Sequence, residues 1–261
     1  MLIKDQVDQA FKDQTIDAKE IERFEQLAEE WWNPAGKFKV MHSFNNARCD
    51  YITTYLSKFF NVRNSDKISF TSLKILDVGC GGGLISEPLA LMGANVVGVD
   101  ATARNIEIAK RHASHTGAIV DYRHGTARTA LDNTESFDAV LNLEVVEHVK
   151  EPKTLIKDCA SFVRPGGLMI VATINRTIQS FLLAILGAEY VLRWLPRGTH
   201  HWKRFLKPDE ISKMLSNNGL NTSDTKGVTL NPLTQKWKVS NDIAVNYLLF
   251  AKKPILRPIK G

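Results

Sequence analysis

The stretch ILDVGCGGGL, residues 75–84, decides the fold of this 261-residue chain. The apolar run from Lys74 to Val78 predicts a short buried strand, and Leu84 to Leu91 after the glycines predicts a helix. Glycines at such a junction let the backbone approach a ligand, and the N-terminus of the next helix favours polar or anionic groups. This stretch therefore predicts a strand, a ligand-binding loop and a helix in succession.

The pattern of this first unit repeats along the chain. Apolar runs predict further strands at 95–99, 119–123, 137–142, 168–173, 221–228 and 245–252. Helical periodicity separates most of them, at 102–114, 151–162 and 209–218. Strands that alternate with helices predict an α/β fold with a mostly parallel, doubly wound sheet of seven strands and helices on both faces.

Three segments fall outside this alternation. Residues 17–32 and 48–60 have amphipathic helical patterns, and Asp17 can cap the first of them. An insert at 175–206 follows the fifth predicted strand. We therefore expect an N-terminal helical cap over 1–65 and one α/β domain over 66–261.

Composition narrows the class of protein. Apolar residues make up 44% and charged residues 24% of the chain, as in ordinary globular proteins. The three cysteines are far apart, the N-terminus lacks an apolar signal, and no apolar run is long enough to span a bilayer. These features predict a cytoplasmic protein.

The net charge of +6 is unevenly distributed. Residues 174–261 hold 14 basic and 5 acidic residues, whereas the rest of the chain is slightly acidic. A basic C-terminal third suits nucleic acid, an anionic membrane or simply a solvated surface. Charge alone leaves these three interpretations open.

Two acids indicate which ligand the glycine loop binds. The loop lacks the third glycine of a dinucleotide fingerprint. Asp77 places a carboxylate at the end of the strand, which disfavours a pyrophosphate there and favours an ammonium group. Asp100 ends the next strand, where an acid accepts hydrogen bonds from ribose hydroxyls. A ribose-bearing ligand with an amino-acid end and no phosphate fits both acids. S-adenosylmethionine is such a ligand.

Four motifs in order carry a family resemblance: LDVGCGGG, VVGVD, FDAVLNLEVVEHV and VRPGGLMIVATINR. They resemble the motifs of class I S-adenosylmethionine-dependent methyltransferases, which implies a single Rossmann-like domain. Three further stretches, IERFEQLAEEWWNPAGKFKVMH, GAEYVLRWLPRGTH and VNYLLFAKK, resemble the ubiquinone-biosynthesis O-methyltransferase family. Together the motifs cover about residues 16–252.

This resemblance implies methyl transfer from S-adenosylmethionine to phenolic hydroxyls of polyprenylated rings. The expected reactions are 3-demethylubiquinol to ubiquinol and 2-polyprenyl-6-hydroxyphenol to 2-polyprenyl-6-methoxyphenol. It also implies a bacterial source, attachment to the inner membrane and other ubiquinone-biosynthesis enzymes as partners. The cofactor-binding residues that it implies are Asp77, Gly79, Gly81, Asp100 and Leu143 on these motifs, and Arg48 in the stretch Asn46-Ala47-Arg48, where the family commonly has Asn-Pro before the arginine.

Glu144, Glu147 and His148 follow the fourth predicted strand, and a helical turn there would place them on one face. Carboxylates with an imidazole suit magnesium, manganese or zinc, which would favour the phenolate form of the acceptor. Without a metal, His148 would orient or deprotonate the acceptor, with Glu144 beside it as a second catalytic residue. The resemblance favours the metal, with magnesium first.

The insert contains the apolar stretch FLLAILGAEYVLRWL, residues 181–195, followed by basic residues up to Lys207. Such a segment can lie in a membrane interface, or be buried in the core or in a homodimer. A polyprenyl substrate resides in the bilayer, so we predict that residues 181–207 contact the membrane surface.

Two other functions are weighed against this interpretation. One is methylation of another small molecule or of RNA, and the basic C-terminal third is the feature that suggests RNA. No appended RNA-binding module accompanies it, and LNLE stands where a base-flipping motif would be, so we expect no nucleic-acid partner. The other is a non-catalytic scaffold, against which the intact glycine loop and the Glu144–His148 motif argue.

Overall fold

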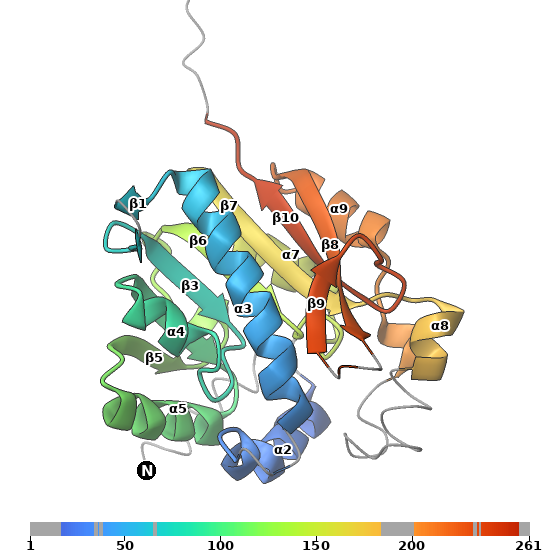
Figure 1. Cartoon of the computed structure of the whole chain (residues 1–261), viewed down its shortest axis with the longest axis horizontal. Coiled ribbons are helices and arrows are strands. Elements are labelled where there is room, and N and C mark those ends of the chain that lie inside the picture. Colours follow the sequence, from blue (N-terminus) through green and yellow to red (C-terminus); the bar gives the residue numbers. More distant parts are fainter. Residues whose placement is uncertain are drawn as a thin grey trace, which may run out of the picture.

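A computed structural model describes residues 17–33, 36, 39–64, 67–183, 201–231, 234 and 236–255. Its main sheet has eight strands in the order β5-β4-β3-β6-β7-β10-β8-β9 (Figure 1). Five neighbouring strands pair in parallel: β3 (Lys74–Val78), β4 (Asn95–Asp100), β5 (Val120–His124), β6 (Phe137–Leu143) and β7 (Val163–Ile174). The predicted mostly parallel α/β sheet is therefore confirmed.

The other three strands pair antiparallel. They are β8 (Asn221–Asn231), β9 (Lys236–Ser240) and β10 (Asn246–Lys252), with β10 inserted between β7 and β8. The sequence predicted seven strands, and β9 is the eighth. It was missed because KWKVS is short and largely polar, and it pairs only at the edge of the sheet, beside β8. A separate short hairpin joins β1 (Arg63–Asn64) to β2 (Lys67–Ile68).

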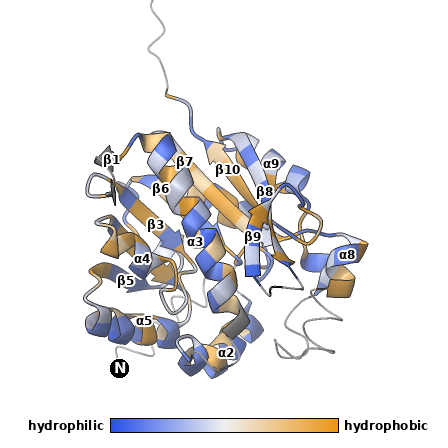
Figure 2. Ribbon diagram, in the orientation of Figure 1, coloured by the Kyte–Doolittle hydropathy of each residue, from blue (hydrophilic) through white to orange (hydrophobic). Residues whose placement is uncertain are grey.

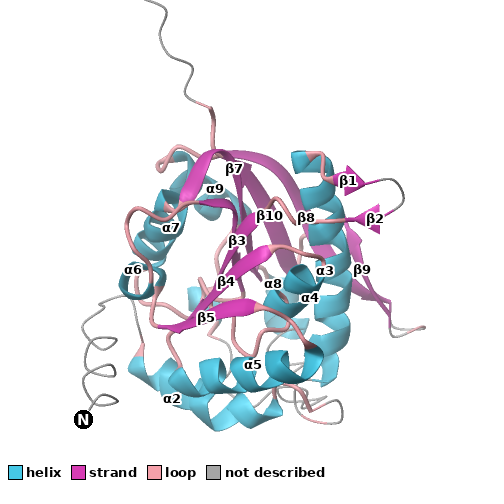
Figure 3. Ribbon diagram, turned by 90° about the vertical axis from the view of Figure 1, so that its left-hand side faces the viewer, coloured by secondary structure: helices cyan, strands magenta, loops and turns pink. Residues whose placement is uncertain are grey.

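Helices cover both faces of the sheet, as predicted. On one face lie α3 (Lys39–Phe60) and α4 (Ser86–Leu91), and on the other lie α7 (Pro152–Ser161) and α9 (Pro208–Ser216) (Figure 3). The short helix α6 (Ala127–Ala130) contacts α7, and α5 (Ala103–Thr116) packs on β4 and β5. The central strands are largely apolar along their length (Figure 2), because both of their faces are buried.

The described part of the N-terminal cap begins with α2 (Ala18–Leu27), which continues into a 3-10 turn at Ala28–Glu30. Asp17 caps α2, since its side chain accepts from the backbone N–H of Lys19. The helix lies against α5, below the sheet in Figure 1. The division into a cap over 1–65 and a domain over 66–261 stays a prediction.

Part of the predicted insert lies outside the described residues, namely 184–200. Its two described ends are α8 (Ile178–Ser180) with residues 181–183, and a 3-10 turn at Trp202–Arg204. Among the described helices, each is too short or too polar to cross a bilayer.

Candidate functional site

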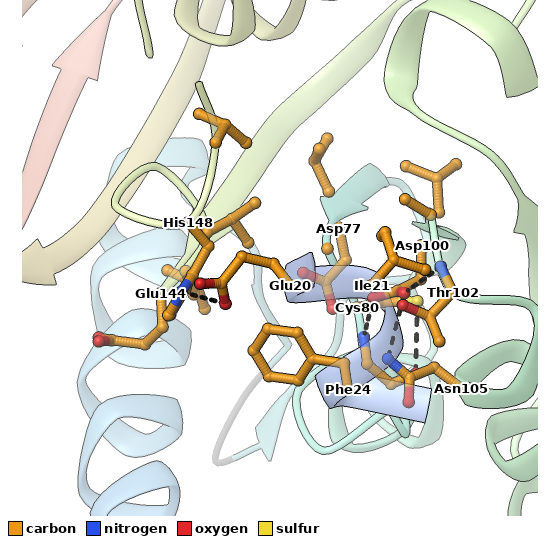
Figure 4. A pocket seen from close by; sticks show the side chains of 18 of the residues that line it. Glu20, Ile21, Phe24, Asp77, Cys80, Asp100, Thr102, Asn105, Glu144 and His148 are labelled. Carbon is orange, nitrogen blue, oxygen red and sulfur yellow. Dashed lines mark hydrogen bonds and ion pairs between the residues drawn. The ribbon is translucent and has the colours of Figure 1, made fainter. Parts of the chain in front are cut away.

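A pocket opens at the carboxyl ends of β3, β4 and β6, with α2 along one side (Figure 4). The glycine loop, the start of the segment after β6, and side chains from α2 and α3 line it. It brings together eight of the nine predicted site residues: Arg48, Asp77, Gly79, Gly81, Asp100, Leu143, Glu144 and His148. Glu147 does not line it. Leu143 ends β6 and is nearly buried at the wall.

The glycine loop has backbone angles that favour glycine. Gly79 and Gly81 have φ values of 77° and 54°, in the left-handed region. A Cβ on Gly81 would come within 2.6 Å of the Trp31 ring. The loop therefore holds the cap as well as lining the ligand pocket. Trp32 adds a hydrogen bond from its indole N–H to the Gly82 carbonyl at 2.8 Å.

Asp100 is tied to the loop and to the start of α5. Its Oδ2 accepts from the Gly81 N–H at 2.9 Å, and its Oδ1 accepts from the Thr102 N–H at 2.8 Å and the Asn105 amide at 3.1 Å. Burial raises the pKa of Asp100, although these hydrogen bonds act in the opposite direction. A carboxylate has about four lone-pair sites, so Asp100 keeps acceptor capacity for hydroxyl groups in the pocket.

Asp77 is buried at the end of β3, only 3% exposed. Its Oδ2 accepts from the Ser86 hydroxyl at 2.6 Å. Burial raises the pKa of Asp77 to about 6. A cation in the pocket would offset the cost of burying this carboxylate, so the site suits an ammonium group.

Arg48 projects from α3 and is buried, with its side chain 4% exposed. Its Nη1 donates to Glu144 Oε1 at 2.6 Å, its Nη2 donates to Asn45, and its guanidinium lies 4.3 Å from the centre of the Phe44 ring. Burial lowers its pKa, although the acids around it act in the opposite direction. Its Nε is buried and has no hydrogen-bond partner among the described residues. This unused donor suits a ligand carboxylate.

The segment after β6 differs from the prediction. Residues 144–148 form a bend and a turn, not a helix, and Glu144 has a φ of 57°, rare for a residue other than glycine. The three predicted metal ligands consequently do not share a face. Glu144 bonds Arg48, Glu147 accepts from Thr173 at 2.8 Å, and His148 Nδ1 lies 3.2 Å from Glu20 Oε2.

The predicted metal set is therefore not assembled. Among the described residues, no three His, Cys, Asp or Glu side chains are grouped so that they could hold a metal ion. Burial, reinforced by the charge of Glu144, raises the pKa of Glu147 well above its ordinary range. In the arrangement described, the three residues do not fit a divalent ion.

Glu20 is a pocket residue that the sequence prediction missed. It comes from α2, faces His148 (Figure 4) and lies 3.6 Å from Arg204. Burial raises the pKa of Glu20, but His148, Arg23 and Arg204 outweigh this effect and lower it overall. Its place three residues after Asp17 indicated only a capping role. No local pattern marks its contact with a turn more than a hundred residues away.

Trp31 and Asn105 were also not predicted as site residues. The Trp31 indole N–H donates to the Asn105 side-chain oxygen at 2.9 Å, while Asn105 donates to Asp100. The cap is thereby connected to the acid that ends β4.

Comparisons with known proteins identify the family of the chain. The methyltransferase domain family matches residues 76–171. The ubiquinone biosynthesis O-methyltransferase of Chelativorans sp. (strain BNC1) is 52% identical over 240 residues, covering 92% of this chain and 95% of that protein. The protein of the same name from Mesorhizobium japonicum is 52% identical over 239 residues, covering 92% and 96%.

Solved structures confirm the fold. Magnesium protoporphyrin IX methyltransferase (ChlM) from Synechocystis PCC 6803, with bound S-adenosylmethionine, aligns with a TM-score of 0.61 at 19% identity, covering 93% of this chain and 100% of that one. This likeness concerns the Rossmann-like class I architecture alone. Identity of about one half over nearly the whole length goes further and bears out the resemblance found in the sequence: the chain belongs to the ubiquinone biosynthesis O-methyltransferase family.

Proposed function

We propose that this protein transfers a methyl group from S-adenosylmethionine to phenolic hydroxyls of polyprenylated ring intermediates in ubiquinone biosynthesis. The two acceptors are 3-demethylubiquinol and 2-polyprenyl-6-hydroxyphenol. The observation that carries the proposal is one pocket that joins Arg48, Asp77 and Asp100 to His148, in a chain 52% identical to a ubiquinone biosynthesis O-methyltransferase.

The three charged residues match the polar parts of the cofactor. When bound, S-adenosylmethionine supplies an electrophilic methyl group on a sulfonium. Asp100 accepts from the ribose hydroxyls, Asp77 faces the ammonium group, and Arg48 binds the carboxylate through donors that include its unused Nε. These residues orient the cofactor relative to His148, and orientation of this kind supplies much of the rate in transfer reactions.

His148 takes the proton from the phenolic hydroxyl. Its Nδ1 lies 3.2 Å from Glu20 Oε2, so Glu20 orients the ring and stabilises the imidazolium that forms. Phe24 packs edge-on against the same ring, with 5.4 Å between ring centres. The phenolate oxygen then attacks the methyl carbon, the bond from that carbon to sulfur breaks, and S-adenosylhomocysteine leaves as the thioether. Two residues of α2 thus position the proposed base.

No step is assigned to a metal ion, because Glu144, Glu147 and His148 each bond a different partner. Chelation tests whether they regroup. If a chelator abolishes turnover and added magnesium, zinc or manganese restores it, the turn must rearrange into a ligand set. Full turnover after chelation leaves His148 as the base.

We also propose peripheral attachment to the inner membrane. Apolar residues at the described ends of the insert are exposed, namely Ile178, Phe181, Leu182, Leu183 and Trp202. Figure 2 shows apolar colour at α8. Basic residues of the same segment, such as Lys203 and Lys207, suit anionic lipid.

Turnover decides the function. Purified protein is incubated with labelled S-adenosylmethionine and a polyprenylated catechol, with tRNA as a parallel acceptor. We expect methylation of the catechol and none of tRNA. Methylation of tRNA alone, or no methyl transfer to any acceptor while the cofactor binds, would contradict the proposal and favour the RNA enzyme or the scaffold.

Liposome sedimentation tests the membrane contact. The double variant Leu182→Glu and Leu183→Glu should bind anionic liposomes several-fold more weakly than the wild type, and added salt should weaken wild-type binding. Ile119→Glu is the control, since it alters an exposed apolar residue next to β5, at the opposite edge of the sheet. Unchanged binding of the double variant would place the contact elsewhere.

A further inference from the structure

Arg48 has two possible anionic partners in one pocket. The structure gives it one of them, Glu144, whose Oε1 accepts from Nη1 at 2.6 Å. Glu144 lines the pocket and its side chain is 21% exposed, whereas that of Arg48 is 4% exposed. The ion pair therefore lies at the pocket wall, with the carboxylate on the accessible side.

A second carboxylate can reach the same guanidinium. Arg48 Nε is buried without a hydrogen-bond partner among the described residues. The other basic side chains that line the pocket contact a carboxylate of α2: Arg23 pairs with Glu20 at 2.6 Å, and His148 faces the same acid. Arg48 lines the same pocket as Asp77 and Gly79, so under the proposed function it is the cation that meets the cofactor carboxylate.

Two carboxylates that share one buried guanidinium repel each other. We propose that Glu144 and the carboxylate of S-adenosylmethionine compete for Arg48, so that cofactor binding releases the Glu144 carboxylate toward the acceptor. The proposal rests on the proposed function, because it takes Arg48 as the binding residue for that carboxylate.

The competition sets the order of binding. While Glu144 is bonded to Arg48, its carboxylate is not available to accept from the phenolic hydroxyl. Once the cofactor carboxylate takes over Arg48, Glu144 can turn its carboxylate to the pocket and hold the acceptor next to His148. The cofactor therefore binds first and the acceptor second. Glu144 is a positioning residue in this scheme.

The test uses two ligands that differ at one end. S-adenosylhomocysteine keeps the amino-acid carboxylate, and methylthioadenosine lacks it. In calorimetry, Glu144→Gln should bind S-adenosylhomocysteine about tenfold more tightly than the wild type, equivalent to about 1.4 kcal/mol. Its affinity for methylthioadenosine should not change. A merely structural role would alter both ligands alike.

The matched control removes the carboxylate of an ion pair between glutamate and arginine that lies outside the pocket. Glu135 lies 2.8 Å from Arg123 and does not line the pocket. Glu135→Gln should leave both affinities as in the wild type. If Glu144→Gln does not fold, Glu144→Asp retracts the carboxylate from Arg48 and should also tighten S-adenosylhomocysteine binding while leaving methylthioadenosine binding unchanged.

Two variants distinguish a failure of the competition from a failure of the Arg48 assignment. Equal or weaker binding of S-adenosylhomocysteine by Glu144→Gln overturns the competition. Arg48→Met tests the underlying assignment, and we expect it to bind S-adenosylhomocysteine at least tenfold more weakly with methylthioadenosine unchanged. Unchanged binding of both ligands by Arg48→Met would overturn the carboxylate assignment itself.

Discussion

The glycine loop and the Glu144–His148 turn lie in the same pocket, but they are held in different ways. Asp100 bonds the loop itself at Gly81, 19 residues earlier, and the start of α5 at Thr102 and Asn105. The turn depends on distant segments: Glu144 bonds Arg48, 96 residues earlier, and His148 faces Glu20 of the cap. The loop thus carries its own geometry, while the chemistry of the turn depends on α2 and α3.

The largest expected effect is a loss of kcat when a residue of the turn is substituted. We expect His148→Ala to lower kcat by about 10²–10⁴-fold, because the acceptor loses its general base. Affinity for S-adenosylhomocysteine should stay within about twofold, since the loop is held independently. Steady-state assays of methyl transfer measure kcat, and calorimetry measures the affinity for S-adenosylhomocysteine. Wild-type kcat in this variant would remove His148 from the proton transfer.

A substitution at the loop should instead lower the affinity for the cofactor. Asp100→Ala removes the acceptor for the ribose hydroxyls and two backbone hydrogen bonds, so we expect affinity for S-adenosylhomocysteine to fall about 10–100-fold. Asp121→Ala is the control, because Asp121 is exposed on β5 and bonds only Arg123 among the described residues. Unchanged affinity of Asp100→Ala would disprove the ribose assignment.

The same contrast explains what could be predicted from the sequence. Strands such as β3 and β4 are continuous apolar runs, and their parallel order places Asp77 and Asp100 at one edge of the sheet. These predictions need only local pattern and topology. The residues predicted to bind the cofactor consequently line one pocket.

The turn could not be predicted in this way. The spacing of Glu144, Glu147 and His148 fits a helix face, but Glu144 adopts a left-handed backbone and the helix never forms. Which partner each side chain takes is decided by Arg48, Thr173 and Glu20, which come from other elements. A single sequence carries no signal for such contacts, so the shared face expected for the three residues was wrong and Glu20 was missed.

A smaller effect should reveal the dependence of the turn on the cap. Glu20→Gln keeps the shape of the side chain but removes the charge that faces His148. We expect kcat to fall about tenfold, with cofactor affinity unchanged. Glu29→Gln is the matched control from the same cap, where Glu29 pairs with Arg111 of α5 at 2.8 Å. Equal kcat in the two variants would show that Glu20 does not act through His148.

The smallest expected effect is on the thermal stability of the protein, through Asp77 at the end of β3, just before the loop. Since burial holds the pKa of Asp77 at about 6, above the ordinary 3.8, the folded protein binds this proton more tightly than the unfolded chain. The contribution of Asp77 to stability is therefore fully present below pH 3.8 and is lost as pH rises through 6. Asp77→Asn removes the penalty and keeps an oxygen for Ser86. We expect its Tm to exceed that of the wild type by roughly 3–6 °C at pH 8 and to match it near pH 4. Thermal unfolding followed by circular dichroism measures both values. A lower Tm at pH 8 would mean that nearby Arg48 stabilises the Asp77 carboxylate more than burial destabilises it, and that the loop, like the turn, depends on α3.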